Sequence, residues 1–240
     1  MIDIWEGIKI TIKDNLLNIE KNIAQALERS GRINDKVEII AVTKTVEVEK
    51  INEVIGLGLD NIGENRTQEL VKKYDIIGDK VKYHMIGHCQ TNKVRTIIDK
   101  VCLVHSLDRM SLAKELNKRA RMNEITIDTL LQVNVAEEES KYGLKVEEVI
   151  PFLEKILKYD NIRIKGLMTI APYAENPEEV RWVFRELRSL SETIKNKNYE
   201  NVEMNILSMG MTNDYKVAIE EGSNMIRVGT GLFGERDYTI

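Results

Sequence analysis

The chain of 240 residues is poor in several residue types that mark particular protein classes. Its two cysteines, Cys89 and Cys102, are too few for a disulfide framework and do not have the spacing of a zinc site. There are three prolines, and no low-complexity linker divides the chain. No apolar run approaches the roughly 20 residues that cross a membrane, and the acidic N-terminus does not resemble a signal peptide. We therefore expect one cytoplasmic domain, residues 1–240, without a membrane span.

Positive charge is not concentrated anywhere in the sequence. Lysine and arginine number 35 against 39 aspartates and glutamates, which gives a formal net charge of −4. Because proteins that bind DNA or RNA carry a basic patch, we expect no nucleic-acid partner. His84 and His88 stand four residues apart, but the stretch is typical of a strand followed by a loop and offers no third ligand. We therefore expect no metal site.

The pattern of apolar residues predicts the fold class. Apolar residues recur every three or four positions from Ile4 to Leu27, which indicates one long helix that ends at Ser30-Gly31. Eight short apolar runs then alternate with amphipathic stretches of helical length, and this alternation is typical of parallel βαβ units. A chain of this length with eight such units favours a closed (β/α)8 TIM barrel with an extra N-terminal helix. The expected strands are 38–43, 59–62, 82–86, 101–105, 127–135, 163–169, 203–207 and 224–228.

The most informative single residue is Lys44, which directly follows the first expected strand. The run from Glu38 to Thr43 is apolar and rich in β-branched residues, as in a strand that is covered on both faces. The carboxyl ends of such strands are where βα folds place their chemistry. Lys44 is therefore a candidate for a reactive amine, and the alternative is a surface lysine in a βα loop.

Two glycine-containing loops follow the last two expected strands. They are Ser208–Asp214 (SMGMTND) and Arg227–Gly234 (RVGTGLFG). Barrels commonly hold a phosphate in these two loops against a short extra helix, and glycine lets the backbone approach a ligand closely. The alternative is that the glycines only form tight turns. Arg227 lies near the end of a buried strand, so it must meet either a ligand or a structural carboxylate.

Other polar residues at strand ends have less specific interpretations. Asn65 follows the second strand and forms a relaxed capping box with Gln68, so helix capping competes with a place in the site. His84 lies on the third strand. His105 ends the fourth, either as a core residue or facing the site. A lysine at one strand end, an anion cradle and an inward arginine together suit pyridoxal 5′-phosphate (PLP).

Several short motifs, in order along the chain, resemble the YggS/PROSC family of pyridoxal phosphate homeostasis proteins. Each motif alone is weak, but together they are highly specific and span Ala41 to Arg236 in the order of the family. The motifs are Ala41–Lys44 (AVTK), Gly63–Asn65 (GEN), His84–Gly87 (HMIG), Gln90–Lys93 (QTNK), His105–Arg109 (HSLDR), Gly166–Met168 (GLM), Leu207–Thr212 (LSMGMT) and Gly222–Gly234.

The resemblance implies the fold, the cofactor and the residue roles. It implies the barrel of the N-terminal domain of alanine racemase, with PLP bound as an imine to Lys44. Arg227 would face the pyridine nitrogen, and Ser208, Gly229 and Thr230 would hold the phosphate. The full set of expected cofactor-binding residues is Lys44, Asn65, His84, Ser208, Met209, Arg227, Gly229 and Thr230.

The family's members bind PLP and help to regulate its supply, so the resemblance implies storage and delivery, with apo PLP-dependent enzymes as recipients and a monomeric state. Two enzymatic alternatives are an amino-acid racemase and an aldolase that uses Lys44. Racemisation needs a second acid/base opposite the lysine, which alanine racemase supplies from outside its barrel. This chain ends at Ile240, about ten residues after the anion cradle, although Tyr142 and Tyr173 lie in loops that could reach the site. We therefore expect a binding protein without turnover.

Overall fold

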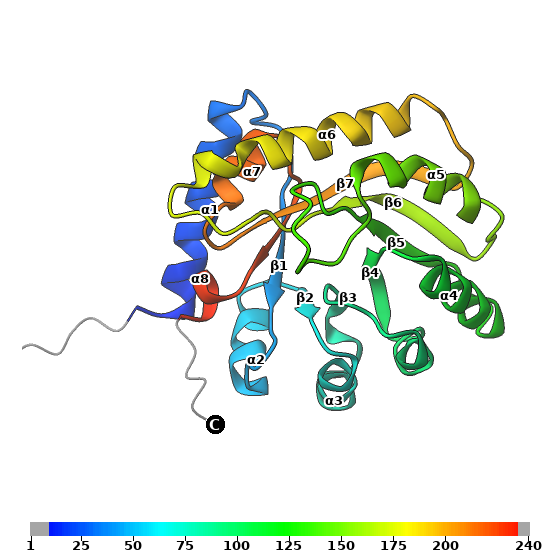
Figure 1. Ribbon diagram of the computed structural model, residues 1–240. Coiled ribbons are helices and arrows are strands. Elements are labelled where there is room, and N and C mark those ends of the chain that lie inside the picture. Colours follow the sequence, from blue (N-terminus) through cyan, green and yellow to red (C-terminus); the bar gives the residue numbers. More distant parts are fainter. Residues whose placement is uncertain (1–9, 235–240) are drawn as a thin grey trace, which may run out of the picture.

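Eight parallel strands form a closed barrel in which each strand pairs with the next along the chain and β8 pairs with β1. The computed structural model describes residues 10–234, and Figure 1 shows the strands at the centre with helices around them. The predicted (β/α)8 barrel is therefore confirmed. The strands are β1 (Glu38–Val42), β2 (Asn61–Glu64), β3 (Lys82–Met85), β4 (Val101–Leu107), β5 (Ile127–Gln132), β6 (Ile162–Met168), β7 (Val202–Met211) and β8 (Met225–Val228).

The helices lie outside the strands and cover them with their apolar faces. None of the described helices is both long enough and apolar enough to cross a membrane. One of the amphipathic stretches expected to be helical, residues 92–99 after β3, forms only a 3-10 helix over Thr91–Thr96. The helical elements are α1 (Ile12–Arg29), α2 (Val48–Gly56), α3 (Thr67–Ile77), η1 (Gly78–Lys80), η2 (Thr91–Thr96), α4 (Met110–Met122), α5 (Val146–Ile156), η3 (Pro177–Val180), α6 (Arg181–Lys195), α7 (Tyr215–Glu220) and α8 (Thr230–Phe233).

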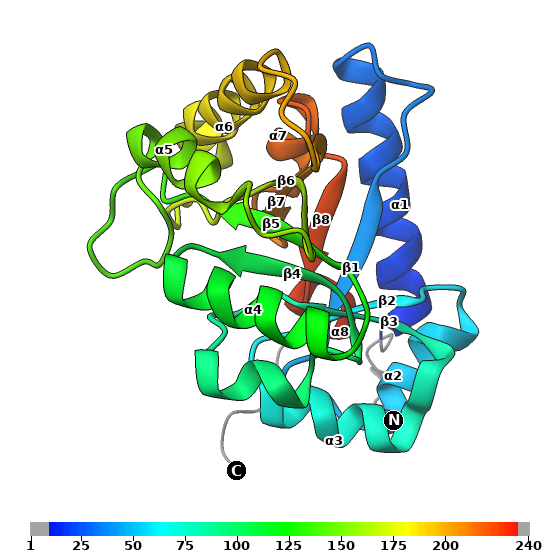
Figure 2. The ribbon, with the colours of Figure 1, turned by 90° about the vertical axis from the view of Figure 1, so that its right-hand side faces the viewer.

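Helix α1 completes the outer ring next to the two shortest helices. It contacts α7 and α8, and Figure 2 shows it along one side of the barrel beside β1. Asn15 and Asn22 donate side-chain hydrogen bonds to Leu232 O and the Tyr215 hydroxyl. The predicted start at Ile4 falls outside the described residues. Within them the helix begins at Ile12, because Thr11 caps it by accepting from Asp14 N.

Strand alternation divides the buried side chains into two sets. The larger apolar core lies between the strands and the helices. A smaller apolar cluster, formed by Ile40, Leu103, Leu130, Met168 and Met225, fills the barrel interior. Side chains two residues apart on a strand share a face, so the strands that supply this interior cluster also direct His105 and Arg227 inward.

Strand β7 extends four residues beyond its predicted end at Leu207. Ser208 pairs in register with Met225 of β8, and Met211 pairs with Arg227. Ser208 therefore lies inside the strand and not in the loop where the sequence pattern placed it. This difference decides which groups its hydroxyl can reach.

Candidate functional site

A cavity of about 380 Å³ opens at the carboxyl ends of the strands. Three of the residues predicted from sequence, Lys44, Asn65 and Arg227, line it together. They come from the ends of β1, β2 and β8, so closure of the barrel brings them to one place. The other lining residues are Val42, Ile86, Gly87, His88, Gln132, Val133, Asn134, Ser140, Lys141, Tyr142, Ile170 and Met211.

The turn that carries Lys44 is fixed through its two neighbours. The Lys73 ammonium donates to the carbonyl oxygen of Thr43 at 2.6 Å, just before Lys44. Just after it, the backbone N–H of Thr45 donates to a carboxylate oxygen of Glu69 at 2.5 Å. Thr45 has a φ of 56°, which is uncommon for a residue with a side chain and marks a sharp turn. The backbone of Lys44 is therefore held on both sides.

The groups that hold this turn form an ionic cluster, which we call the Lys73 cluster (Thr43, Glu64, Glu69 and Lys73), in which all but the half-buried Glu69 are buried. Lys73 pairs with Glu64 at 2.7 Å and with Glu69 at 2.9 Å. The Thr43 hydroxyl donates to Glu64 at 2.5 Å. Burial raises the pKa of Glu64, whose side chain is fully buried, and the charge of Lys73 opposes that shift. Lys44 itself has no carboxylate within ion-pair distance among residues 10–234.

Asn65 reaches the cavity because the loops after β2 and β3 touch. A Cβ atom on Gly87 would lie 2.4 Å from Asn65 O, so only glycine permits this approach. Helix α3 begins at Thr67 with Arg66 as its N-cap and without a side-chain capping bond. Asn65 therefore does not cap α3, and this alternative is wrong.

Arg227 is buried at the base of the cavity. One terminal nitrogen donates to the Ser208 hydroxyl at 2.7 Å, and the other donates to Thr169 O at 2.8 Å. Burial lowers the pKa of Arg227 to about 10, and Asp214 opposes the shift. The guanidinium remains charged at neutral pH. It has no ion pair within the described part of the chain, so the alternative of a structural salt bridge is wrong.

Ser208 and His84 lie beneath Arg227 in the barrel interior and do not line the cavity. The Ser208 hydroxyl contacts Arg227 and also His105 Nδ1 at 3.1 Å. His105 Nε2 contacts His84 Nδ1 at 3.0 Å. Ser208 and His84 therefore act on the cavity only indirectly. Ser208 does so through its bond from Arg227, and His84 does so through His105 and Ser208.

The residues predicted to hold a phosphate divide between two places. Gly229 and Thr230 directly follow Val228, the last residue of β8, and Gly229 is the N-cap of α8. The backbone N–H of Gly231 donates to the Thr212 hydroxyl at 3.2 Å, which joins the loops after β7 and β8. A Cβ on Gly231 would lie 2.9 Å from the Thr212 methyl carbon. Hydroxyl and backbone N–H groups therefore converge at this end of the barrel.

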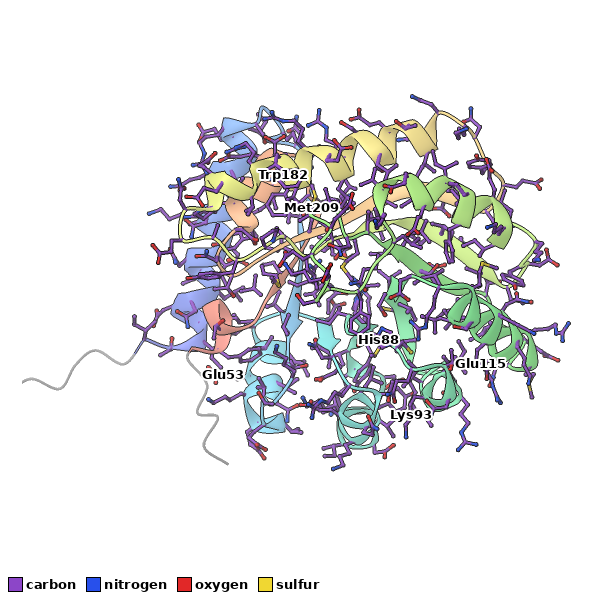
Figure 3. The ribbon with its side chains drawn as sticks, in the orientation of Figure 1. Glu53, His88, Lys93, Glu115, Trp182 and Met209 are labelled. Atoms are coloured by element: carbon purple, nitrogen blue, oxygen red, sulfur yellow. The ribbon has the colours of Figure 1, made fainter. Side chains whose placement is uncertain are left out.

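Met209 points away from the cavity. Its side chain belongs to the core between the barrel and the helices, because it neighbours the inward Ser208 on the same strand. Figure 3 labels Met209 beneath α6 and His88 on the side of α3.

Two rings from different loops pack against each other on the cavity wall. His88 stacks on Tyr142 with 3.9 Å between ring centroids and an interplanar angle of 24°. The segment between β5 and α5 that carries Tyr142 also carries Lys141, whose ammonium donates to Glu138 and to Ala171 O. Of the two lysines that line the cavity, Lys44 is thus the one without a carboxylate partner in the described chain.

Sequence reasoning missed three contributors. Thr212 belongs to the predicted loop, but the sequence analysis favoured the Ser208 hydroxyl, although Thr212 lies nearer the start of the next helix. The sequence analysis also did not select Glu64 and Lys73. The pattern that could have indicated their ion pair is a glutamate at a strand end with a lysine nine positions later on the following helix. Across residues 10–234, no three His, Cys, Asp or Glu side chains gather in a way that would hold a metal ion.

Comparison with known proteins gives a consistent result. The family model described as alanine racemase, N-terminal domain, matches residues 15–237. A pyridoxal phosphate homeostasis protein of Aquifex aeolicus is 46% identical over 226 residues, which cover 94% of this chain and 98% of the relative.

Solved structures agree with this match. A Bifidobacterium adolescentis protein of unknown function superposes with a TM-score of 0.88 at 34% identity, covering 92% of this chain and 94% of that one. PipY of Synechococcus elongatus with PLP bound superposes with a TM-score of 0.81 at 27% identity, covering 93% and 100%. The motifs, the barrel and these matches together show that the chain belongs to the pyridoxal phosphate homeostasis proteins, within the family of alanine racemase N-terminal domains.

Proposed function

We propose that this protein binds PLP in the cavity at the carboxyl ends of its strands and takes part in the supply of the cofactor. The observation that carries the proposal is that Lys44, free of any carboxylate partner in the described chain, lines the same cavity as the buried cation Arg227. When bound, PLP supplies an aldehyde that reacts with amines. Lys44 offers the amine, and its fixed backbone turn directs it into the cavity.

The residues fit the other parts of this cofactor as well. A guanidinium only donates hydrogen bonds, so Arg227 suits the lone pair of a pyridine nitrogen. The cavity volume of about 380 Å³ lies in the range of small-molecule sites. The stacked rings of His88 and Tyr142, with Asn65 nearby, form a wall for a flat aromatic ligand.

For the phosphate, we propose the loop ends at Thr212, Gly229 and Thr230, together with backbone N–H groups of the short helix α8. Phosphates bind where hydroxyls and free backbone N–H groups converge. The bond between Gly231 N and Thr212 Oγ1 supports this placement, because it brings both loops to one point. Ser208 lies deeper and already contacts Arg227 and His105, so we assign it an indirect role.

The test of covalent binding is reduction of the PLP-treated protein with borohydride, followed by peptide mapping. We expect the trapped cofactor on Lys44, and the Lys44→Ala variant should lose it. Lys141→Ala is the matched control, because Lys141 lines the same cavity but is paired with Glu138. Recovery of the cofactor on Lys141 of the wild-type protein, with Lys44 unmodified, would overturn the assignment.

We further propose that the protein holds and transfers PLP, as a cytoplasmic monomer, without efficient turnover of amino acids. Its relatives are named as homeostasis proteins. Arg227 leaves the pyridine nitrogen without a proton of its own, which weakens the ring as an electron sink. The expected recipients are apo PLP-dependent enzymes, and transfer is measured as the recovery of their activity.

A racemase is the second candidate, and one observation favours it. Tyr142 lines the cavity with Lys44, so a tyrosine is available as a second acid/base. Its ring stacks on His88, which suits a wall residue. The two candidates separate when the loaded protein is incubated with L-amino acids in deuterated water. Multiple-turnover exchange at Cα that depends on both Lys44 and Tyr142 would establish the racemase.

A further inference from the structure

The barrel interior contains a line of polar side chains that its surroundings do not explain. The neighbouring interior residues are apolar, yet His105 and Ser208 are fully buried among them. Burying polar groups costs free energy unless each one is hydrogen-bonded, and apolar residues of similar size would fill the space at lower cost. A line of this kind therefore calls for a function.

The direction of the hydrogen bonds follows from the end nearest the cavity. Arg227 donates to Ser208 Oγ at 2.7 Å, and a guanidinium cannot accept. Ser208 therefore turns its single proton toward its other partner, His105 Nδ1, at 3.1 Å. Because Nδ1 of a neutral His105 accepts this bond, the ring proton of His105 is on Nε2.

The same reasoning continues into the next ring. His105 Nε2–H donates to His84 Nδ1 at 3.0 Å, so the proton of His84 is also on Nε2. That N–H donates to Asn61 Oδ1 at 3.0 Å, with Cys102 Sγ at 3.4 Å. Four bonds thus run in one direction from Arg227 to Asn61.

The far end fixes the same direction independently. Asn61 Nδ2 donates to Asp60 Oδ1 at 2.9 Å, and an ionised carboxylate only accepts. The amide nitrogen therefore faces Asp60, and the amide oxygen must face His84. An obligate donor at one end and an obligate acceptor at the other agree on every proton between them.

We propose that Ser208, His105, His84 and Asn61 form a hydrogen-bond chain of fixed direction whose role is to position Arg227 toward the cavity. The proposal deepens the proposed function, because it concerns the residue assigned to the pyridine nitrogen. A hydroxyl that donates is polarised into a better acceptor, so the chain strengthens the bond from Arg227 to Ser208. With Thr169 O on the other terminal nitrogen, the guanidinium is held in one orientation. Ser208 and His84 are thus positioning residues.

The hydrogen-bond chain requires both His84 and His105 to be neutral. A protonated His105 would donate from Nδ1 to Ser208 and place a second positive charge beside Arg227. Burial lowers the pKa of His105 well below its ordinary value, and the neighbouring His84 and Arg227 side chains lower it further. Burial also lowers the pKa of His84 to about 4, with Lys82 and Asp60 as the charged groups near it. The geometry and the surroundings therefore agree.

The first experiment uses the protein without cofactor. The chain has three histidines, so long-range nitrogen-15 NMR spectra resolve each ring, and His88→Gln identifies the third. We expect His84 and His105 to be neutral Nε2–H tautomers between about pH 5.5 and pH 8. A proton on Nδ1 of either ring, or a charged ring in that range, would refute the chain.

The second experiment measures what the chain does for Arg227. The probes are PLP and its 1-deaza analogue, in which a C–H group replaces the pyridine nitrogen. Wild-type protein should prefer PLP by about tenfold or more, since a hydrogen bond from a charged donor is lost with the analogue. His105→Met, whose thioether is only a weak acceptor and cannot donate to His84, should lose most of this preference while its affinity for the analogue stays within about twofold. His105→Gln, whose amide can accept from Ser208 and donate to His84, should retain the preference.

The control is Leu103→Met, a change of shape in the same interior layer beside His84. It should leave the preference unchanged. An equal loss of affinity for both probes in His105→Met would show that the histidine only supports the fold, and would overturn the proposal. If wild-type protein bound neither probe, the proposed function would fail, while the NMR experiment would still decide whether the chain has its fixed direction.

Discussion

Lys44 and Arg227 line the same cavity, but the protein holds them in different ways. The side chain of Lys44 has no carboxylate partner in the described chain, and the turn is held through its neighbours by Lys73 and Glu69. Arg227 is held by its own guanidinium, through Ser208 and Thr169. The first arrangement uses buried charges, and the second uses neutral groups.

The difference follows from what each residue is proposed to do. An amine that reacts with an aldehyde must keep its nitrogen free of a permanent partner, so the fold fixes the backbone and leaves the side chain open. A cation that faces a ring nitrogen must point in one direction. Neutral partners fix that direction without adding a counter-charge that would compete for the same N–H groups.

The largest expected effect comes from breaking the Lys73 cluster, which holds the backbone of Lys44. Lys73→Met leaves the fully buried Glu64 carboxylate without its ammonium. Removing one partner of a buried pair costs about 3–5 kcal/mol. Urea unfolding should show a loss of this size, and adding Glu64→Gln should recover part of it. Lys72→Met on the exposed face of the same helix is the control, with a change of about 0.5 kcal/mol or less. Equal effects of the two lysine changes would show that the cluster does not hold the turn.

Acid should destabilise the folded protein through His84, which belongs to the neutral hydrogen-bond chain beneath Arg227. The pKa of His84 is lowered from 6.5 to about 4, so the unfolded chain binds a proton in this range that the folded protein does not. Stability therefore falls as pH falls from about 6.5 to about 4, by about 3 kcal/mol for this residue. The difference in unfolding free energy between wild-type protein and His84→Gln, measured across this range, isolates the histidine from the carboxylates. A difference that does not vary with pH would contradict the buried neutral state.

The smallest of the three effects concerns the proposed phosphate site, where Thr212 meets the loop that follows β8 and Arg227. Thr212→Val keeps the shape of the side chain but removes its hydroxyl. A hydrogen bond to a charged group contributes about 1.5–3 kcal/mol, so affinity for PLP should fall by about tenfold or more. Affinity for pyridoxal, which has no phosphate, serves as the internal control and should not change. If wild-type protein bound pyridoxal as tightly as PLP, the proposed phosphate site would be wrong.

Much of the fold followed from local rules. Strand-length apolar runs alternating with amphipathic segments predicted eight βα units, and each expected strand matches an observed one to within a few residues. Lys44 at the end of the first strand and Arg227 near the end of the eighth needed no tertiary information, because chain order in a parallel barrel places all strand ends on one face. That residues 1–240 form a single domain stays a prediction.

The prediction of the phosphate site was less accurate, because it depended on the length of β7. Ser208 was assigned to a loop, but β7 continues to Met211 and pairs with β8 there. The hydroxyl that meets the helix start is therefore that of Thr212. Met209, next to Ser208, necessarily faces the opposite side of the strand, an alternation that the sequence pattern already contained.

The sequence alone thus determined the alternation, the order of the elements and the residues at the strand ends, since these depend on neighbours within a few positions. Only the tertiary structure decided the partners. Lys73 meets Thr43 across 30 positions, and His105 meets Ser208 across 103. Contacts of this kind form only when the barrel closes and brings distant strands into register, because a hydrogen bond depends on distances of about 3 Å that no local pattern specifies.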